Sequence, residues 1–154
     1  MAITNFTGDV FKSNAPVIAH QVNCKGVMGS GIALQVRQRY PNVFHTYRAR
    51  CRGEGPAALL GSIQPCRCGG AMERWIVNCF AQESYGVGVC HTNYTAFKLC
   101  FQRLHCWAQA NGIKKIAIPY RIGCDRAGGD WGIVHKILRE IFGESNIDLE
   151  IWRL

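Results

Sequence analysis

The stretch VIAHQVNCKGVMGSGIA (residues 17–33) joins three kinds of local structure without a break. Residues 17–23 are mostly apolar and predict a buried central strand. Three glycines between residues 26 and 31 predict a loop. A helix should begin at Ser30 or Gly31 and end at Tyr40, because Pro41 follows. The sequence therefore predicts a strand, a glycine loop and a helix in direct succession.

The same succession occurs again near residue 120. Residues 114–119 predict a second buried strand, residues 122–129 a second glycine loop, and Asp130 stands where the N-cap of a helix belongs. Strands that alternate with helices favour an α/β fold, in which ligands bind at the carboxyl ends of the strands. Glycines let backbone N–H groups approach a phosphate, and a helix N-terminus adds positive potential. Two such loops side by side predict a site for a diphosphate.

The glycines also have a simpler interpretation, in which they only make tight turns. The first loop has the spacing G-x-x-G-x-G, which differs from the dinucleotide-binding motif, and no Walker lysine precedes a serine or threonine. Spacing alone leaves both interpretations open.

The remaining segments extend the α/β pattern. Residues 92–110 should form a helix, because apolar residues recur there at steps of three and four along one stripe. Residues 147–152 alternate apolar with polar side chains such as Glu150, which predicts a closing strand with one solvated face. Further strands are expected at residues 59–63 and 75–79, and loops at residues 48–56 and 84–88.

Length and composition narrow the class of protein. A chain of 154 residues predicts one domain over residues 1–154. Its nine cysteines lack zinc-like spacing and no signal peptide precedes them, so we expect a reduced, cytoplasmic protein without metal or cofactor. No apolar run approaches the ~20 residues of a membrane span, so no membrane partner is expected.

The net charge of +8 favours phosphorylated or polyanionic partners, although a solvated basic face has the same composition. The chain has no recognised nucleic-acid-binding motif, and its aromatic residues fall on predicted buried stripes. Nucleic acid is therefore not an expected partner.

Three motifs in order resemble those of one family. Residues 7–11 (TGDVF) are similar to the opening G-D-[ILV] of macrodomains, residues 20–33 to their first phosphate loop, and residues 119–131 (PYRIGCDRAGGDW) to their second. The chain thus resembles the macrodomain (Appr-1″-p processing) family. Its first loop is similar to that of the branch containing terminal ADP-ribose protein glycohydrolase and the yeast-type ADP-ribose 1″-phosphate phosphatase, and the chain resembles a bacterial or phage version. The resemblance spans Asn5 to Leu154. It implies a three-layer α/β/α fold with a central mixed, mostly parallel sheet of about six strands.

The resemblance also implies a site for ADP-ribose or a derivative, including an ADP-ribosylated macromolecule. Asp9 matches the aspartate that accepts the adenine amino group, and Asn23 matches the asparagine near the distal ribose. Each also has a structural interpretation, as a turn or cap aspartate and as a satisfied strand-end amide. The residues predicted to bind ADP-ribose are Asp9, Val10, Gln21, Asn23, Gly26, Met28, Gly29, Ser30, Gly31, Ile32, Tyr120, Ile122, Gly123, Cys124, Asp125 and Arg126.

The catalytic residues of this branch are only partly present. The glycohydrolase uses a lysine where residues 78–82 read NCFAQ, and an aspartate where this chain has Ala127. A lysine-linked covalent sugar intermediate is therefore not expected. The predicted catalytic candidates are Asp125, Asp130, Asn23 and His20. Asp130 has a second interpretation as an N-cap, and His20 has one as a buried structural histidine.

Two functions follow from these residues. The first is hydrolysis of an ADP-ribose derivative, such as ADP-ribose 1″-phosphate or an ADP-ribosylated macromolecule, by a carboxylate that activates water. The second is a binding module that senses or sequesters an ADP-ribose-type signal without catalysis.

Overall fold

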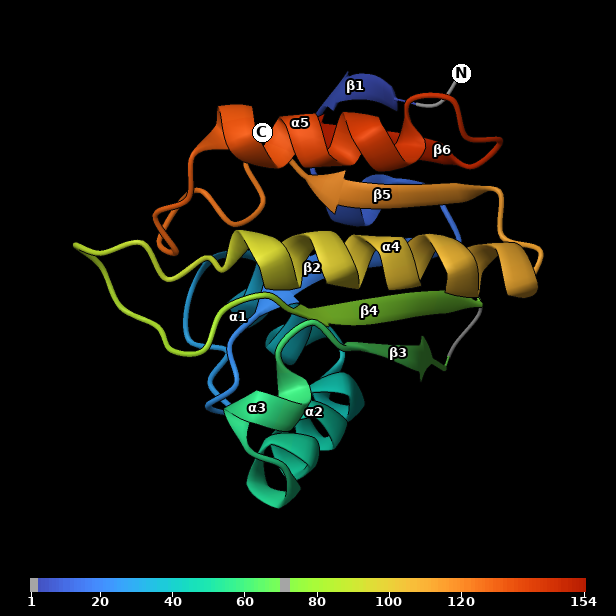
Figure 1. Cartoon of the computed structure of the whole chain (residues 1–154). Helices are drawn as coiled ribbons and strands as arrows, with labels where there is room; N and C mark the ends of the chain where they lie inside the picture. The colour runs from blue at the N-terminus through green and yellow to red at the C-terminus, as the bar shows by residue number, and fades with distance from the viewer. Residues whose placement is uncertain (1–2, 70–72) are drawn as a thin grey trace.

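The computed structural model describes residues 3–69 and 73–154. The middle layer is one six-stranded sheet with strand order β1-β6-β5-β2-β4-β3 (Figure 1). Neighbouring strands are parallel, except that β3 runs antiparallel to β4. The predicted mixed, mostly parallel sheet of about six strands is confirmed. Its strands are β1 (Ile3–Thr7), β2 (Val17–Val22), β3 (Ile63–Cys68), β4 (Arg74–Phe80), β5 (Lys115–Pro119) and β6 (Asp148–Arg153).

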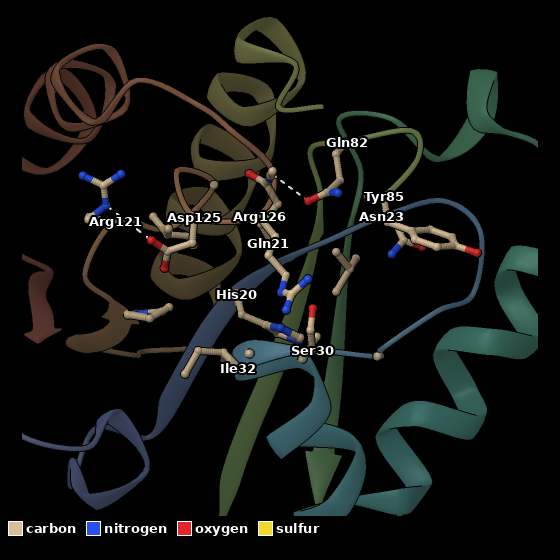
Figure 2. A pocket seen from close by; sticks show the side chains of 18 of the residues that line it. His20, Gln21, Asn23, Ser30, Ile32, Gln82, Tyr85, Arg121, Asp125 and Arg126 are labelled. Carbon is tan, nitrogen blue, oxygen red and sulfur yellow. Dashed lines mark hydrogen bonds and ion pairs between the residues drawn. The ribbon is translucent and has the colours of Figure 1, made fainter. Parts of the chain in front are cut away.

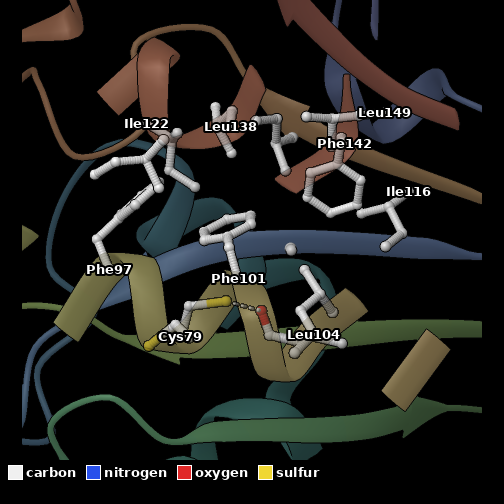
Figure 3. Packing of buried hydrophobic residues seen from close by; sticks show 14 of the residues in the cluster. Cys79, Phe97, Phe101, Leu104, Ile116, Ile122, Leu138, Phe142 and Leu149 are labelled. Carbon is white, nitrogen blue, oxygen red and sulfur yellow. Dashed lines mark hydrogen bonds between the residues drawn. The ribbon is translucent and has the colours of Figure 1, made fainter. Parts of the chain in front are cut away.

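Helices cover both faces of this sheet and confirm the three-layer α/β/α prediction (Figure 1). On one face, Phe101 of α4 and Phe142 of α5 belong to one hydrophobic core (Figure 3). On the other face, Val36 of α1 and Tyr47 of α2 belong to a second core. The helices are η1 (Val10–Lys12, 3₁₀), α1 (Gly31–Arg39), α2 (Pro41–Gly53), α3 (Pro56–Leu59), α4 (Tyr94–Ala110) and α5 (Trp131–Phe142).

The apolar stripe predicted for the fourth helix is buried. Phe97, Phe101, Leu104 and Ala108 have no exposed surface, and the rings of Phe97 and Phe101 stack with centroids 4.5 Å apart. The side chain of Asn93 caps the helix by accepting a hydrogen bond from the backbone N–H three residues later, at 3.0 Å. Packing of this stripe against the sheet explains why the helical pattern is reliable here.

The loop predicted at residues 48–56 is wrong, because α2 begins at Pro41 and continues to Gly53. Proline fits the first turn of a helix, where its missing N–H would have no partner. Pro41 therefore ends α1 and begins α2. Tyr47 then anchors α2 in the core with no exposed surface.

The strand predicted at residues 59–63 is also wrong. Leu59 ends the short helix α3 with its side chain fully buried. The strand that follows, β3, begins at Ile63 and pairs with β4 from that residue onward. Leu59 belongs to the second core and Leu60 packs against it, whereas Ile63 packs against the first core.

The face of β6 that carries Glu150 is exposed at Asp148 but buried at Glu150, so the predicted solvation holds only at its start. Glu150 is 5% exposed and accepts hydrogen bonds from Ser13 Oγ (2.5 Å) and Trp152 Nε1 (2.8 Å). Lys115 Nζ lies 3.6 Å from its other oxygen. The carboxylate is buried because these partners replace water. The N-terminal strand β1 pairs with β6 in parallel and forms the edge of the sheet. The sequence pattern did not indicate this strand.

All nine cysteines are free thiols. Within residues 3–69 and 73–154, no group of three histidine, cysteine or acidic side chains is arranged to hold a metal ion. In the same residues, no helix combines the length and the apolar character needed to cross a membrane.

Candidate functional site

The C-terminal ends of β2, β4 and β5 open onto two neighbouring cavities, here called lobes, which have part of their lining in common; Figure 2 shows the larger one. The large lobe has a volume of about 410 Å³ and lies between the two predicted loops. The second lobe, here called the Asp9 lobe, has a volume of about 350 Å³. The shared wall consists of Gly31, Ile32, Pro119, Tyr120, Arg121 and Asp125. The two lobes therefore lie side by side.

Most of the residues predicted to bind a ligand do line this cavity. Asp9 and Val10 line the Asp9 lobe. Gly26, Met28 and Cys124 do not line either lobe. Those that line the large lobe are Gln21, Asn23, Gly29, Ser30, Gly31, Ile32, Tyr120, Ile122, Gly123, Asp125 and Arg126.

The three predicted residues outside the cavity shape the loops from below. Met28 is fully buried and belongs to the core beneath the first loop. Gly26 adopts φ +79°, which favours glycine, and its Cα faces Arg48 of α2. Cys124 is 4% exposed, and burial raises the pKa of its thiol to about 11. Direct ligand contact is therefore not the role that their positions support.

Asn23 holds the first loop in place at the end of β2. Its Oδ1 accepts hydrogen bonds from Lys25 N (2.9 Å) and from the Tyr47 hydroxyl (2.8 Å). Its Nδ2 donates to the Val27 carbonyl at 2.8 Å. Both ends of the amide are thus engaged, as the strand-end interpretation predicts, although Asn23 also lines the large lobe.

The first loop leads into the N-terminus of α1 at the cavity. Ser30 is the N-cap residue, and its side chain makes no capping hydrogen bond. Gly31, Ile32 and Ala33, the first residues of α1, line the large lobe. The first N–H groups of a helix have no partner within the helix, so this end attracts anions.

The second loop is fixed by a chain of side-chain hydrogen bonds. Gln21 Nε2 donates to Gln82 Oε1 (2.9 Å) and to Thr92 Oγ1 (2.9 Å). The Thr92 hydroxyl donates in turn to the Gly123 carbonyl at 2.5 Å. Gly123 adopts φ +76°, and a Cβ there would lie 2.7 Å from Gln21 Oε1. Glycine is therefore required at this position by both conformation and space.

The three acidic candidates differ in their surroundings. Asp9 Oδ1 accepts a hydrogen bond from Phe11 N (3.0 Å) as the cap of η1, while Oδ2 lies 3.5 Å from Arg39. Asp125 lines both lobes, and its side chain pairs with Arg121 Nε at 3.3 Å. Asp130 caps α5, as its N-cap interpretation predicts, and does not line the cavity. Among the residues that the structure describes, Asp125 is thus the one acidic side chain that lines the large lobe.

His20 lines the large lobe although it is 1% exposed. Its Nε2 lies 2.6 Å from Asn78 Oδ1, and Asn78 Nδ2 donates to Gln64 Oε1. Asn78 Oδ1 is therefore an acceptor, so His20 carries its proton on Nε2. Burial lowers the pKa of His20 to about 4, which keeps the ring neutral at pH 7. Its Nδ1 is a buried acceptor without a hydrogen-bond partner in the described part of the chain.

Several lining residues were absent from the predicted site. Gln82, Tyr85 and Gly86 come from the segment after β4 and line the large lobe. Trp152 and Arg153 come from the end of β6 and line the Asp9 lobe. The absence of a lysine from residues 78–82 was the sequence signal for the first group. Trp152 and Arg153 gave none, because only the parallel order of β1, β6 and β5 brings them to the cavity.

The fold and the paired loops define a class of α/β domain that holds a phosphorylated ligand at the carboxyl ends of its strands. The sequence model of the Macro domain family matches residues 19–138. This match covers most of the chain, which therefore belongs to the Macro domain family, as the three motifs predicted.

Individual proteins are similar to parts or all of the chain. A Mycobacterium tuberculosis protein named DNA ADP-ribosyl glycohydrolase is 47% identical over 53 residues, covering 34% of this chain and 15% of that protein. A Chaetomium globosum protein named ADP-ribose 1″-phosphate phosphatase is 41% identical over 63 residues, covering 40% of this chain and 34% of that protein. The chain thus matches about a third or less of the length of these relatives. The solved macrodomain of Mycobacterium tuberculosis DarG has a TM-score of 0.85 and 27% identity, over 97% of this chain and 96% of that one.

Burial of His20 predicts a loss of stability in mild acid. An unfolded histidine has a pKa near 6.5, so between about pH 6.5 and pH 4 the unfolded chain binds a proton that the folded chain does not. The free energy of unfolding should fall by about 3 kcal/mol over this range because of His20. Urea denaturation at pH 7 and pH 4.5 should show a smaller acid loss for His20→Gln than for the wild type. The exposed His45 supplies the control, since His45→Gln should lose as much as the wild type. Equal losses in wild type and His20→Gln would contradict a buried, neutral histidine.

Proposed function

We propose that the cavity binds an ADP-ribose derivative and hydrolyses a bond at its distal ribose. The main support is the arrangement of two glycine loops that face one another across the large lobe at the ends of β2 and β5. The loops present backbone N–H groups and a helix N-terminus, which suit a diphosphate. The names of the two curated relatives, a glycohydrolase and a phosphatase, both refer to ADP-ribose chemistry.

The two lobes suit the two ends of such a ligand. In the Asp9 lobe, a carboxylate oxygen of Asp9 can accept a hydrogen bond from an adenine amino group, and Trp152 supplies an aromatic wall. In the large lobe, the polar side chains of Asn23, Ser30 and Gln82 suit the hydroxyls of a ribose. The diphosphate then spans the shared wall between α1 and the second loop.

In the proposed hydrolysis, Asp125 is the general base. Its carboxylate removes a proton from a water molecule as the water oxygen attacks the phosphorus or sugar carbon of the distal bond, a contribution of roughly 10²- to 10⁴-fold. The bond from that atom to the leaving group breaks, and the leaving group takes up a proton. The bond is either a phosphate ester of the distal ribose or the bond to an ADP-ribosylated macromolecule. The segment 78–82, where the branch has its lysine, has none here, so the reaction proceeds without a covalent lysine intermediate. Gln82 of this segment lines the large lobe, and its amide donates to the Ser84 carbonyl at 2.6 Å.

The same glutamine favours the second candidate, a module that binds without hydrolysis. Gln82 is held on both sides by hydrogen bonds, which suits a fixed wall of a binding site.

The name of the mycobacterial relative includes DNA, so a nucleic acid is one macromolecule that can carry the ADP-ribose in the proposed reaction. Our sequence-based exclusion of nucleic acid partners therefore stays a prediction.

Binding is tested at a glycine that can accept a side chain. A Cβ on Gly29 would meet only Val27 Cγ1, at 3.5 Å, so Gly29→Val should leave the thermal unfolding midpoint nearly unchanged. The branched side chain should obstruct the first loop and weaken ADP-ribose binding at least tenfold in calorimetry, since backbone approach is lost. Gly53→Val on α2, where a Cβ meets nothing within 4 Å, is the matched control and should bind normally. Gly123→Val is less informative, because its clash with Gln21 would disturb the loop itself. Normal ADP-ribose affinity in Gly29→Val would rule out close approach of the first loop to the ligand.

Catalysis is tested by removing the charge of Asp125. Asp125→Asn should lower turnover of ADP-ribose 1″-phosphate or of an ADP-ribosylated substrate about 10²-fold or more, while ADP-ribose affinity changes little. Release of phosphate and of ADP-ribose should be followed separately. Asp130→Asn is the control for charge near this loop, because Asp130 caps α5 outside the cavity. Unchanged turnover in Asp125→Asn would refute the proposed base. A wild type that binds ADP-ribose but releases neither product would support the binding module instead.

A further inference from the structure

Arg126 places an unpaired positive charge inside the large lobe. Figure 2 shows its side chain reaching from the second loop into the cavity toward Ser30 and His20. Among the residues that the structure describes, no hydrogen bond or ion pair engages its guanidinium. An unpaired guanidinium in a concave site is a preferred partner of phosphate, because its planar N–H groups match two phosphate oxygens.

The other charges of the lobe cancel one another. Arg121 pairs with Asp125 at 3.3 Å and also donates to the Cys124 carbonyl at 3.1 Å. These two charged side chains line both lobes, at the wall between them. Arg126 belongs to the large lobe alone and lies beyond that wall. Its charge is therefore the net charge that the distal end of a ligand meets.

Two neighbouring features suit the same kind of ligand group. The N-terminus of α1 faces the lobe at Ser30, whose hydroxyl makes no capping hydrogen bond. This hydroxyl and the first N–H groups of α1 are donors for an anion. His20 Nδ1 is a buried acceptor without a partner among the described residues, and it suits a hydroxyl that donates a hydrogen bond. A cation, free donors and one acceptor together match a sugar that carries both hydroxyls and a phosphate.

We propose that Arg126 forms a subsite for a phosphate monoester on the distal ribose, and so selects phosphorylated over unphosphorylated ADP-ribose. This inference rests on the proposed function, because it assumes that ADP-ribose occupies the two lobes. It assigns the chain a substrate with an anionic distal end. The distal phosphate sits beside the Arg126 guanidinium and the Ser30 hydroxyl, while the N–H groups of α1 serve the diphosphate, and a ribose hydroxyl faces His20.

The test compares two ligands on the full chain by calorimetry. The ligands are ADP-ribose and its non-hydrolysable 1″-phosphonate analogue, which carries the extra anion without turnover. The wild type should bind the phosphonate about tenfold or more tightly than ADP-ribose, the effect of one charge-assisted contact. Arg126→Gln should reduce this preference to about one while changing ADP-ribose affinity less than about threefold. Arg126→Lys should restore part of the preference, because it restores the charge without the planar fork.

A second variant controls for the loss of positive charge. Arg52→Gln removes one exposed charge on α2 outside both lobes and should keep the wild-type preference. A preference that persists in Arg126→Gln would overturn the subsite. Equal weakening of both ligands in Arg126→Gln would also overturn it, since the guanidinium would then contact the diphosphate. A wild type that binds both ligands equally would overturn the subsite and leave the proposed function standing. A wild type that binds neither ligand would refute the proposed function itself.

Discussion

The side-chain amide of Gln21 joins the three segments that bound the large lobe. Its two N–H groups reach Gln82 after β4 and Thr92 before α4, each at 2.9 Å. Thr92 extends the chain of hydrogen bonds to the Gly123 carbonyl in the second loop. Gln82 Oε1 is the acceptor for one N–H group of Gln21, and Thr92 Oγ1 is the acceptor for the other. A side chain without an acceptor at position 82 would leave one donor of Gln21 unpaired, so the two glutamines are structurally matched.

Several of the positively charged side chains have a structural role on the surface of the molecule. The net charge of +8 suggested a phosphorylated or polyanionic partner, yet several arginines lie over aromatic rings. Arg37 lies 4.2 Å from the ring centroid of Phe44, and Arg39 lies 4.5 Å from that of Phe11. Such contacts stabilise the outer surface of the second core through cation–π attraction and through the apolar stems of the arginines. Much of the positive charge thus has a structural role, whereas Arg126 in the large lobe has none.

Local signals predicted those parts of the fold whose structure is decided locally. The two strand–loop–helix units, the Asp130 cap and the stripe that contains Phe101 were all evident, because turn residues and helical periodicity act over a few positions. The helix at residues 48–53 and the strand β1 were missed. Polar residues on an exposed helix face resemble a loop in sequence, and an edge strand with one partner has little apolar pattern.

The sequence likewise indicated only those lining residues of the cavity that lie in continuous motifs. The first loop and Asp125 were evident from motifs that are continuous in sequence. Trp152 and Arg153 were not, because strand order alone brings the end of β6 beside β5 and the cavity. The burial of Glu150 was missed for the same reason, since its partners Ser13 and Lys115 come from other elements.

A crystal structure of the chain with ADP-ribose would test this account of the cavity. The account predicts one elongated ligand across both lobes, with diphosphate oxygens about 2.7–3.2 Å from backbone nitrogens of the α1 N-terminus and of the second loop. The adenine should lie in the Asp9 lobe and the distal ribose in the large lobe. A diphosphate held outside the two loops, or an adenine in the large lobe, would contradict it.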